Sequence, residues 1–149
     1  MGKSNAISAA EVRFQRWDST ASTPGWEDIA EITSLSGPGM SRDTIDVTHF
    51  GSEGWREFIA GLKDGGDVSL SMNFTRDTYQ IMYDDFNNDD KQIYKVVLPD
   101  ESSTSLEFEG LVTELPISAD VGDKVSSDVS IKVSGKPEMY DGSSGSGAY

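Results

Sequence analysis

The amino-acid sequence predicts a mainly β protein, an antiparallel β-sandwich or barrel with one flanking α-helix. Several short segments alternate apolar and polar residues with the period of two that a half-buried strand requires. A single segment repeats its apolar residues with the period of a helix, and turns rich in Gly, Pro and Ser separate the elements. A chain of 149 residues suits one domain with one core.

We expect this chain to have three parts of unequal size. Residues 1–10 are small and polar and are expected to form a flexible N-terminal segment. Residues 11–137 form the β domain. Residues 138–149 are dominated by Gly and Ser, which favours a flexible C-terminal tail without a core of its own.

Three strands are predicted in the first third of the chain, at residues 11–17, 29–35 and 44–48. In the first strand, Val12 and Phe14 share a face. In the third, Ile45 and Val47 alternate with polar neighbours. A loop rich in Ser and Thr follows the first strand, and an SGPG run ends the second strand with a strong turn signal.

Residues 49–66 (HFGSEGWREFIAGLKDGG) break the alternating pattern, and two interpretations of this segment remain open. Trp55, Phe58, Ile59 and Leu62 have helical spacing, which favours a short helix packed on the core. The alternative is an apolar loop that buries its side chains on a neighbouring subunit, because large aromatic groups are costly to leave in water. The candidates for such a contact are Phe50, Trp55, Arg56 and Phe58.

The clearest patterns are a strand and a helix that follow one another, at residues 67–75 and 77–87. Four apolar residues share one face of the strand. In the helix the apolar residues fall at i, i+3, i+4 and i+7, and Thr75 or Asp77 can cap the N-terminus. The apolar residues are Val68, Leu70, Met72 and Phe74 in the strand, and Tyr79, Met82, Tyr83 and Phe86 in the helix.

Three further strands are predicted at residues 92–98, 105–118 and 125–133. The middle strand changes phase at Gly110, where we expect a β-bulge. The last strand has the most regular alternation. One of its faces consists of Val125, Val129, Ile131 and Val133.

The charge balance restricts the possible functions. The chain has 12 Lys and Arg against 26 Asp and Glu, a net charge of −14, and such a surface repels nucleic-acid phosphates. The absence of cysteine excludes disulfides and thiolate metal sites. No run approaches the roughly 20 apolar residues that a membrane helix needs. We expect neither conventional nucleic-acid binding nor a membrane partner.

Candidate catalytic and metal-ligating residues are sparse. His49 is the sole histidine, and no nucleophile motif accompanies it. DDFNNDD at 84–90 has the spacing of the first calcium-loop ligands, but Asp90 replaces the required Gly and Val96 the bidentate Glu. Glu107 and Glu109 lie on one strand face without a sign of a cleft. We predict no enzyme activity, no cofactor and no metal.

Six segments occur in an order that is informative as a set. They are DTIDVT, GLKDGGDVSL, DTYQIMYDDFNNDD, QIYKVVLPD, SLEFEGLVTELPIS and VSSDVSIKVSGKP. This order resembles the major tail tube proteins of lambda-like siphophages over residues 29–137. The resemblance implies the tail-tube fold, a β-sandwich with a flanking helix that oligomerises into rings of six copies. The rings stack into a tube, strands from all copies join into one inner barrel, and long loops reach the adjacent ring.

The resemblance also implies partners and a location. The subunit would contact further copies of itself, the tape measure protein, and tail terminator and baseplate proteins. DNA would pass through the lumen without specific binding, and the subunit would be assembled in the host cytoplasm into the virion tail. An acidic lumen would repel the DNA backbone and let it slide. Our candidates for the lumen lining are the polar residues Ser69, Ser71, Asn73, Asp128 and Ser130.

Two alternatives to a phage tail tube subunit remain open at this stage. The first is a tube subunit of a type VI-like secretion system, which would share the fold and the ring but pass a protein. The second is a monomeric β-sandwich module for adhesion or decoration, for which an acidic polar surface would be enough.

Overall fold

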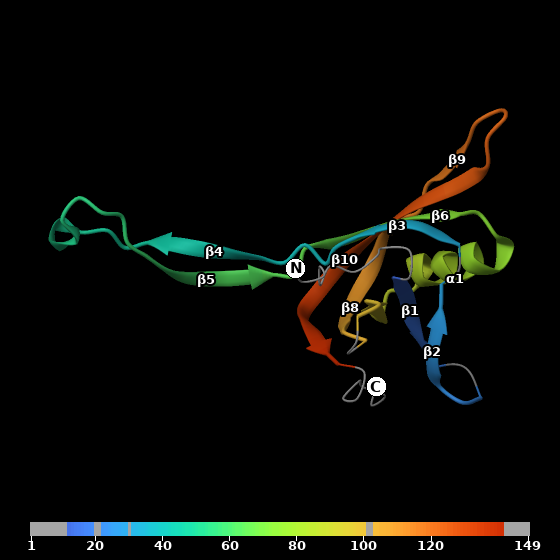
Figure 1. The fold of residues 1–149 in the computed structure, drawn as a ribbon, viewed down its shortest axis with the longest axis horizontal. Coiled ribbons are helices and arrows are strands. Elements are labelled where there is room, and N and C mark those ends of the chain that lie inside the picture. The colour runs from blue at the N-terminus through green and yellow to red at the C-terminus, as the bar shows by residue number, and fades with distance from the viewer. Residues whose placement is uncertain (1–11, 20–21, 30, 101–102, 142–149) are drawn as a thin grey trace, which may run out of the picture.

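The computed structural model describes residues 12–19, 22–29, 31–100 and 103–141, which form a body with a long projecting hairpin (Figure 1). Within these residues the body contains an eight-stranded sheet and one α-helix, and the hairpin is a separate two-stranded sheet. A shorter projection, the turn between β9 and β10, leaves the body away from the hairpin (Figure 1). The expected N-terminal segment and residues 142–149 of the expected tail lie outside the described residues.

The strands of the body are all antiparallel and follow the order β2-β1-β7-β8-β10-β6-β3, with β9 paired to the start of β10. The hairpin consists of β4 and β5. The elements are β1 (Arg13–Asp18), β2 (Gly25–Asp28), β3 (Ile32–Ser36), β4 (Ser41–Asp46), the 3-10 helix η2 (Phe50–Ser52), β5 (Phe58–Asp64), β6 (Asp67–Asn73), α1 (Arg76–Asn87), β7 (Gln92–Val97), β8 (Ser105–Glu114), β9 (Ile117–Ala119) and β10 (Val125–Tyr140).

The large sheet curls so that its two ends share one core. Phe14 of β1 and Val68 of β6 lie towards opposite ends of the strand order, yet both belong to the same buried cluster. Tyr94 contacts the rings of Phe14 and Phe108, with centroids 5.5 Å and 5.8 Å away, and these two rings also contact each other at 6.5 Å. The predicted antiparallel sandwich or barrel with one flanking helix is therefore confirmed.

The alternation of residues 67–75 and 125–133 formed β6 and β10 with the predicted faces, whereas the predicted strand 105–118 is divided into β8 and β9. In β6, Val68, Leu70 and Met72 are at most 2% exposed, while the polar residues between them face outward. In β10 the predicted apolar face is buried from Val129 to Val133. The strand then continues to Tyr140, past the expected domain boundary at residue 137. The short strand β2 was not predicted, since its four residues show no alternation.

Helix α1 begins after Thr75, whose hydroxyl caps it by accepting the Thr78 N–H. The predicted helix is confirmed, but its buried face is rotated. Thr78, Met82 and Asp85 are the buried residues, whereas Tyr83 and Phe86 of the predicted apolar face are about half exposed. A buried ion pair at Asp85 decides the rotation, because it turns the aromatic side chains outward.

Asp85 forms a polar cluster inside the body with Arg16 of β1 and Tyr94 of β7. Arg16 donates two hydrogen bonds to the carboxylate, at 2.7 Å from Nε and 2.6 Å from Nη2, and the Tyr94 hydroxyl donates a third at 2.8 Å. Hydrogen bonding to Asp85 raises the pKa of Arg16, and burial raises the pKa of Tyr94. The cluster ties the helix to two strands of the sheet.

Gly110 of β8 does not form the predicted bulge. Pairing with β10 continues through Gly110 without a shift, Gly110 is the last residue of β8 to pair with β7, and Phe108, Gly110 and Val112 all face inward. The two irregularities of the β8–β10 pairing lie on either side of Gly110, between Ser130 and Ile131 and between Ser134 and Glu138 of β10. Glycine is needed at 110 for another reason: a Cβ there would lie 2.7 Å from Ile131 Cγ2 and 2.8 Å from the Lys132 carbonyl oxygen.

The short helix considered for residues 55–62 was wrong, because this segment enters strand β5. Ile59 pairs with Ile45 of β4 in an antiparallel register, and the Val47 N–H bonds to the Glu57 carbonyl oxygen at 2.9 Å. Gly61 permits close contact, since a Cβ there would lie 2.9 Å from the Asp43 carbonyl oxygen. Helical spacing therefore occurred by coincidence in a strand that has no buried face.

Candidate functional site

The structure brings the five candidate lumen residues together on the outward face of β6 and β10. Ser69 lies directly opposite Ser130, and Ser71 directly opposite Asp128. Asn73 pairs with Ser126 one step further along the same face. The face is polar over both strands, and its side chains are exposed or half-buried.

The charges on this polar face are mainly acidic. Asp128 accepts a hydrogen bond from the Ser71 hydroxyl at 2.6 Å and is otherwise open to solvent. Lys132 lies on the same face, 3.7 Å from Asp67 and 3.6 Å from Asp64. The bond from the Gly66 N–H, together with Lys132, lowers the pKa of Asp64. The single lysine is therefore neutralised locally, and Asp128 keeps its negative charge facing outward.

Two strand edges flank this polar face. In the strand order β9-β10-β6-β3, the described residues give β3 one partner, β6, and give β9 one partner, β10. Each of these strands therefore leaves one row of backbone N–H and C=O groups without a strand beside it in the described chain. Such edges can pair with strands of another copy.

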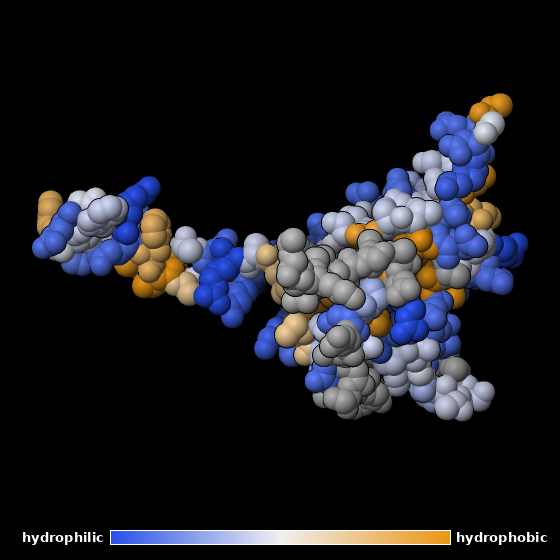
Figure 2. Space-filling model, viewed as in Figure 1, coloured by the Kyte–Doolittle hydropathy of each residue, from blue (hydrophilic) through white to orange (hydrophobic). Residues whose placement is uncertain are grey.

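The four candidate contact residues all lie on the projecting β4–β5 hairpin, away from the core. Phe50 is fully exposed, Trp55 is 78% exposed and Phe58 is 51% exposed. Figure 2 shows hydrophobic side chains along the hairpin, outside the body. Of the two interpretations of this segment, packing on the chain's own core is thus excluded for these side chains, and contact with another subunit remains a prediction.

The end of the hairpin is held in shape by a small polar network, in which His49 has a structural position. His49 Nδ1 accepts the Gly51 N–H at 3.0 Å, and its backbone N–H donates to the Ser52 hydroxyl at 3.1 Å. The Ser52 hydroxyl donates to Glu57, which also lies 3.2 Å from His49 Nε2. These contacts explain the sole histidine without a catalytic role, since it caps the 3-10 helix η2.

Arg56 links the two sides of the hairpin. Its guanidinium lies 2.9 Å from the Asp46 carboxylate and 5.7 Å from the centre of the Phe58 ring. The Thr48 hydroxyl and N–H, together with Arg56, lower the pKa of Asp46. A folded and charged hairpin end thus presents exposed aromatic side chains.

Several exposed apolar residues were missed as candidates for contacts. The alternation of residues 44–48 marks one strand face, but it does not reveal that this face lacks a cover within the chain. Val121, in the turn after β9, is likewise fully exposed. The missed side chains more than half exposed are Met40, Ile45, Ile59, Leu62, Tyr83, Ile117, Val121 and Met139.

The carboxylates considered for chemistry are separated by the fold. Asp85 is engaged by Arg16 inside the body, whereas Asp90 lies at the exposed end of the helix segment. Glu107 is buried and Glu109 is exposed. Within the described residues no group of three or more His, Asp and Glu side chains is arranged to hold a metal ion. Nor is any described helix long and apolar enough to cross a membrane.

A comparison with protein families identifies this arrangement. The family described as Lambda phage tail tube protein, TTP, matches residues 12–140. The chain belongs to this family. This tail tube protein is a structural, non-enzymatic subunit of a phage tail tube and a component of the virion tail. Membership favours a phage tail tube over the secretion-system and adhesion alternatives.

Solved structures share the fold of the tail tube protein. The tail of an empty gene transfer agent particle matches with a TM-score of 0.75 and 19% identity, covering 91% of this chain and 99% of that one. The SPP1 tail tube matches with a TM-score of 0.70 and 12% identity, covering 91% and 80%. None of the curated proteins compared with the chain matches it.

A third structure with this fold comes from the end of a tube. The sheath/tube terminator of an extracellular contractile injection system matches with a TM-score of 0.70 and 14% identity. The match covers 93% of this chain and 99% of that chain. At these identities the structural matches establish the fold of the tail tube protein alone.

Proposed function

We propose that six copies of this protein form a ring, that the rings stack into a tube, and that the lumen conducts DNA during ejection. The observation that carries the proposal is the four-strand run β9-β10-β6-β3. Its two central strands, β6 and the middle of β10, have a buried apolar face and an outward polar face, and the described residues leave an open edge at β3 and at β9. A run of this kind closes into a barrel when the β3 edge of one copy pairs with the β9 edge of the next.

The ring number is supported by the gene transfer agent tail, whose structure has C6 symmetry. An open edge at each end of the run makes the contact between copies head-to-tail, and such contacts generate rings when the rotation closes. Closure also removes the exposed edges, which would otherwise allow indiscriminate pairing.

The β4–β5 hairpin is our proposed contact between rings. It extends far beyond the body (Figure 1) and carries Phe50, Trp55 and Phe58 in solvent. Burial of an aromatic side chain of this size contributes about 1.5–3 kcal/mol. Seating the hairpin on the adjacent ring therefore stabilises the stack, with Arg56 and Asp46 at the edge of the contact.

The outward polar face of the four-strand run is our proposed lumen lining. Ser69, Ser71, Asn73, Asp128 and Ser130 lie side by side there. Hydroxyl and carboxylate groups offer no cation to hold a phosphate, and Asp128 repels it. DNA then moves along the lumen without specific binding.

Tape measure, terminator and baseplate proteins are proposed to meet the lumen and the two ends of the tube. The fold shared with a tube terminator supports a common geometry at one end, because similar subunits can stack on one another. A terminator or baseplate protein would bind this chain on the surface that another ring would otherwise cover.

The test of the ring and tube is direct. We expect purified protein at rising concentration to give rings or filaments by negative-stain microscopy and a growing mass by light scattering. Material that remains a single copy at high concentration contradicts the proposal.

The hairpin contact has its own test. Trp55→Ala should fold but fail to form tubes, whereas Phe86→Ala on the exposed face of α1 should assemble normally. Normal tubes from Trp55→Ala exclude the hairpin contact.

The lumen assignment has a separate test. Asp128→Lys should slow DNA ejection from particles that assemble normally, because it places a phosphate-binding cation in the channel. Asp90→Lys introduces the same charge change on the exposed helix end and should have no effect. Equal ejection by both variants removes Asp128 from the lining.

A further inference from the structure

A cavity of about 610 Å³ lies where the hairpin leaves the body, between the base of β4 and β5 and the middle of β10. Three of the chain's 12 basic residues line it, so positive charge is concentrated here in a protein whose net charge is −14. The residues that matter for its chemistry are Met40, Arg42, Lys63, Val133, Lys136 and Pro137.

Two of the three cations of this cavity, Arg42 and Lys63, have no carboxylate partner among the described residues. Arg42 and Lys63 lie directly opposite one another on β4 and β5, and like charges in that position are destabilising. The third cation, Lys136, forms an ion pair with Glu138, whose carboxylate lies 3.8 Å away. Asp64, the acid of the lining, is already engaged by Lys132 at 3.6 Å.

Apolar side chains form another part of the lining. Val133 forms part of its wall from the buried face of β10, and Met40, which is 57% exposed, and Pro137 lie beside it. A complementary occupant therefore has an apolar centre flanked by negative charges.

The turn between β9 and β10 has this combination of groups. Val121 is fully exposed, and Asp120 and Asp123 flank it. The turn is closed by the Asp123 N–H, which donates to the Asp120 carbonyl oxygen at 3.0 Å, and Gly122 has a φ of +87°. Both carboxylates and the valine are thus presented on a defined turn at the tip of a projection.

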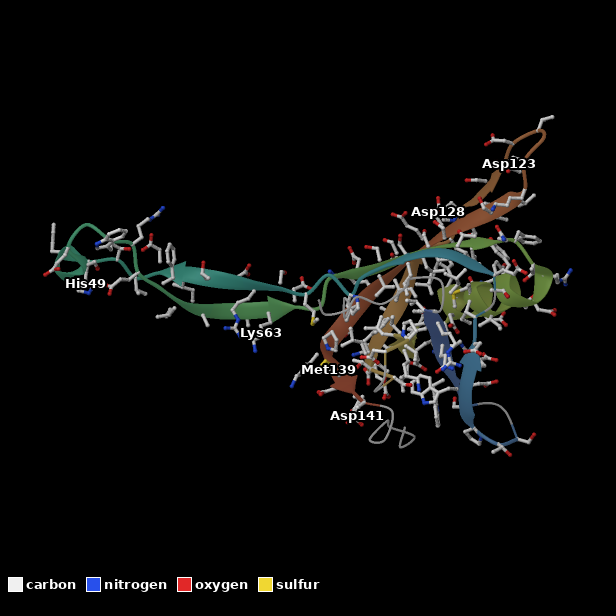
Figure 3. All side chains as sticks on the ribbon, in the orientation of Figure 1. His49, Lys63, Asp123, Asp128, Met139 and Asp141 are labelled. Atoms are coloured by element: carbon white, nitrogen blue, oxygen red, sulfur yellow. The ribbon has the colours of Figure 1, made fainter. Side chains whose placement is uncertain are left out.

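The turn cannot reach the cavity of its own chain. Val125, at the start of β10, and Val133, in the cavity wall, are separated by eight residues of extended strand, or about 26 Å at roughly 3.3 Å per residue. Figure 3 places Asp123 at the tip of the upper projection and Lys63 near the base of the hairpin, at opposite sides of the body. Only another copy of the chain can bring the two together.

We propose that the β9–β10 turn of one copy docks in the cavity at the hairpin base of a neighbouring copy. Val121 contacts Met40 and Val133, and Asp120 and Asp123 neutralise Arg42 and Lys63. The contact is head-to-tail, so each copy in the assembly donates one turn and accepts another. The inference rests on the proposed assembly into a tube, and it adds a specific polar contact to the strand-edge and hairpin contacts.

The test is a reciprocal charge reversal in the full chain. Asp120→Lys with Asp123→Lys, or Arg42→Glu with Lys63→Glu, should each raise the protein concentration needed for assembly by about tenfold or more, because like charges then face each other. Combining all four substitutions should restore assembly. Asp89→Lys with Asp90→Lys makes the same charge change at the exposed end of α1 and should assemble like the wild type.

The outcomes separate the inference from the function on which it rests. If the wild type forms no rings or tubes, the proposed function fails. If the wild type assembles and the Asp120/Asp123 variant assembles equally well, only the docking contact is wrong. If each pair of substitutions abolishes assembly and the four-substitution variant does not restore it, the two pairs do not contact one another. That result overturns the proposal.

Cross-linking gives an independent measurement, since the chain contains no cysteine. Val121→Cys combined with Met40→Cys should form disulfide-linked ladders in assembled material under oxidising conditions. Asp89→Cys combined with Met40→Cys is the matched control and should not. Ladders from the control alone, or from neither variant, contradict the contact.

Discussion

The body and the β4–β5 hairpin are built from strands with similar alternation but end in opposite environments. In β6 of the body, Val68, Leu70 and Met72 are at most 2% exposed. In the hairpin, Ile45 and Ile59 form a direct cross-strand pair and are each more than half exposed. An isolated two-stranded hairpin is marginally stable in water, so its apolar face indicates a partner outside the chain.

The largest expected difference between the two regions comes from removing one aromatic side chain in each. Phe14→Ala should lower the free energy of unfolding by about 3–5 kcal/mol, because it leaves a cavity in the core. Phe50→Ala should change it by no more than about 0.5 kcal/mol, since the side chain is fully exposed. Denaturant unfolding of the monomer measures both, and equal losses would show that the hairpin is packed in solution.

The polar cluster of the body should be nearly as sensitive. Asp85→Ala leaves the buried Tyr94 hydroxyl without its acceptor and leaves Arg16 with Glu27 as its remaining carboxylate, and should cost about 3 kcal/mol of unfolding free energy. Asp84→Ala removes a neighbouring carboxylate that is exposed on the same helix, and should cost no more than about 0.5 kcal/mol. Comparable values for the two variants would mean that the cluster does not hold the helix to the sheet.

A smaller effect is expected where β8 and β10 approach closely. Gly110→Ala should destabilise the body by about 1–3 kcal/mol, because the new methyl group meets the Lys132 backbone. Gly25→Ala in β2 is the control, since the nearest atom to its Cβ is 4.0 Å away. Thermal unfolding of both proteins checks the contrast, and a neutral Gly110→Ala would point to a looser sheet.

The smallest effect is a pH dependence confined to the hairpin. The pKa of Asp46 is lowered in the folded protein, so its contribution is present above the ordinary aspartate value of about 3.9 and is lost as the pH falls below it. The protection against exchange of the Glu57 amide, whose N–H bonds to the Thr48 hydroxyl, should therefore fall at acidic pH when the observed rate is compared with the intrinsic rate at the same pH. Asp46→Asn should remove this dependence; an unchanged profile would assign it to another group.

Much of the fold was predictable because local patterns in the body agree with the final packing. The alternation of β6 and β10 indicated both the strands and their faces, and Thr75 indicated where α1 begins. The candidate lumen residues were chosen from the same alternation, and the register then placed them on one continuous face. Their role in a lumen remains a prediction.

The errors arose where a long-range contact decided the outcome. Helical spacing at residues 55–62 gave no sign that β4 would pair with this segment, and the aromatic residues of α1 gave no sign that Asp85 would be turned inward by Arg16 of β1. The cavity that Arg42 and Lys63 line was equally invisible, because strand pairing alone brings these residues opposite one another.

By itself, the amino-acid sequence determined the fold class, the position of the helix and the membership of the tail tube family, because these depend on local periodicity and the order of segments. Only the tertiary structure decided which apolar faces are covered and which are left for other copies. The physical reason is that alternation separates two faces of a strand without specifying what each face contacts, and that contact depends on residues distant in the chain.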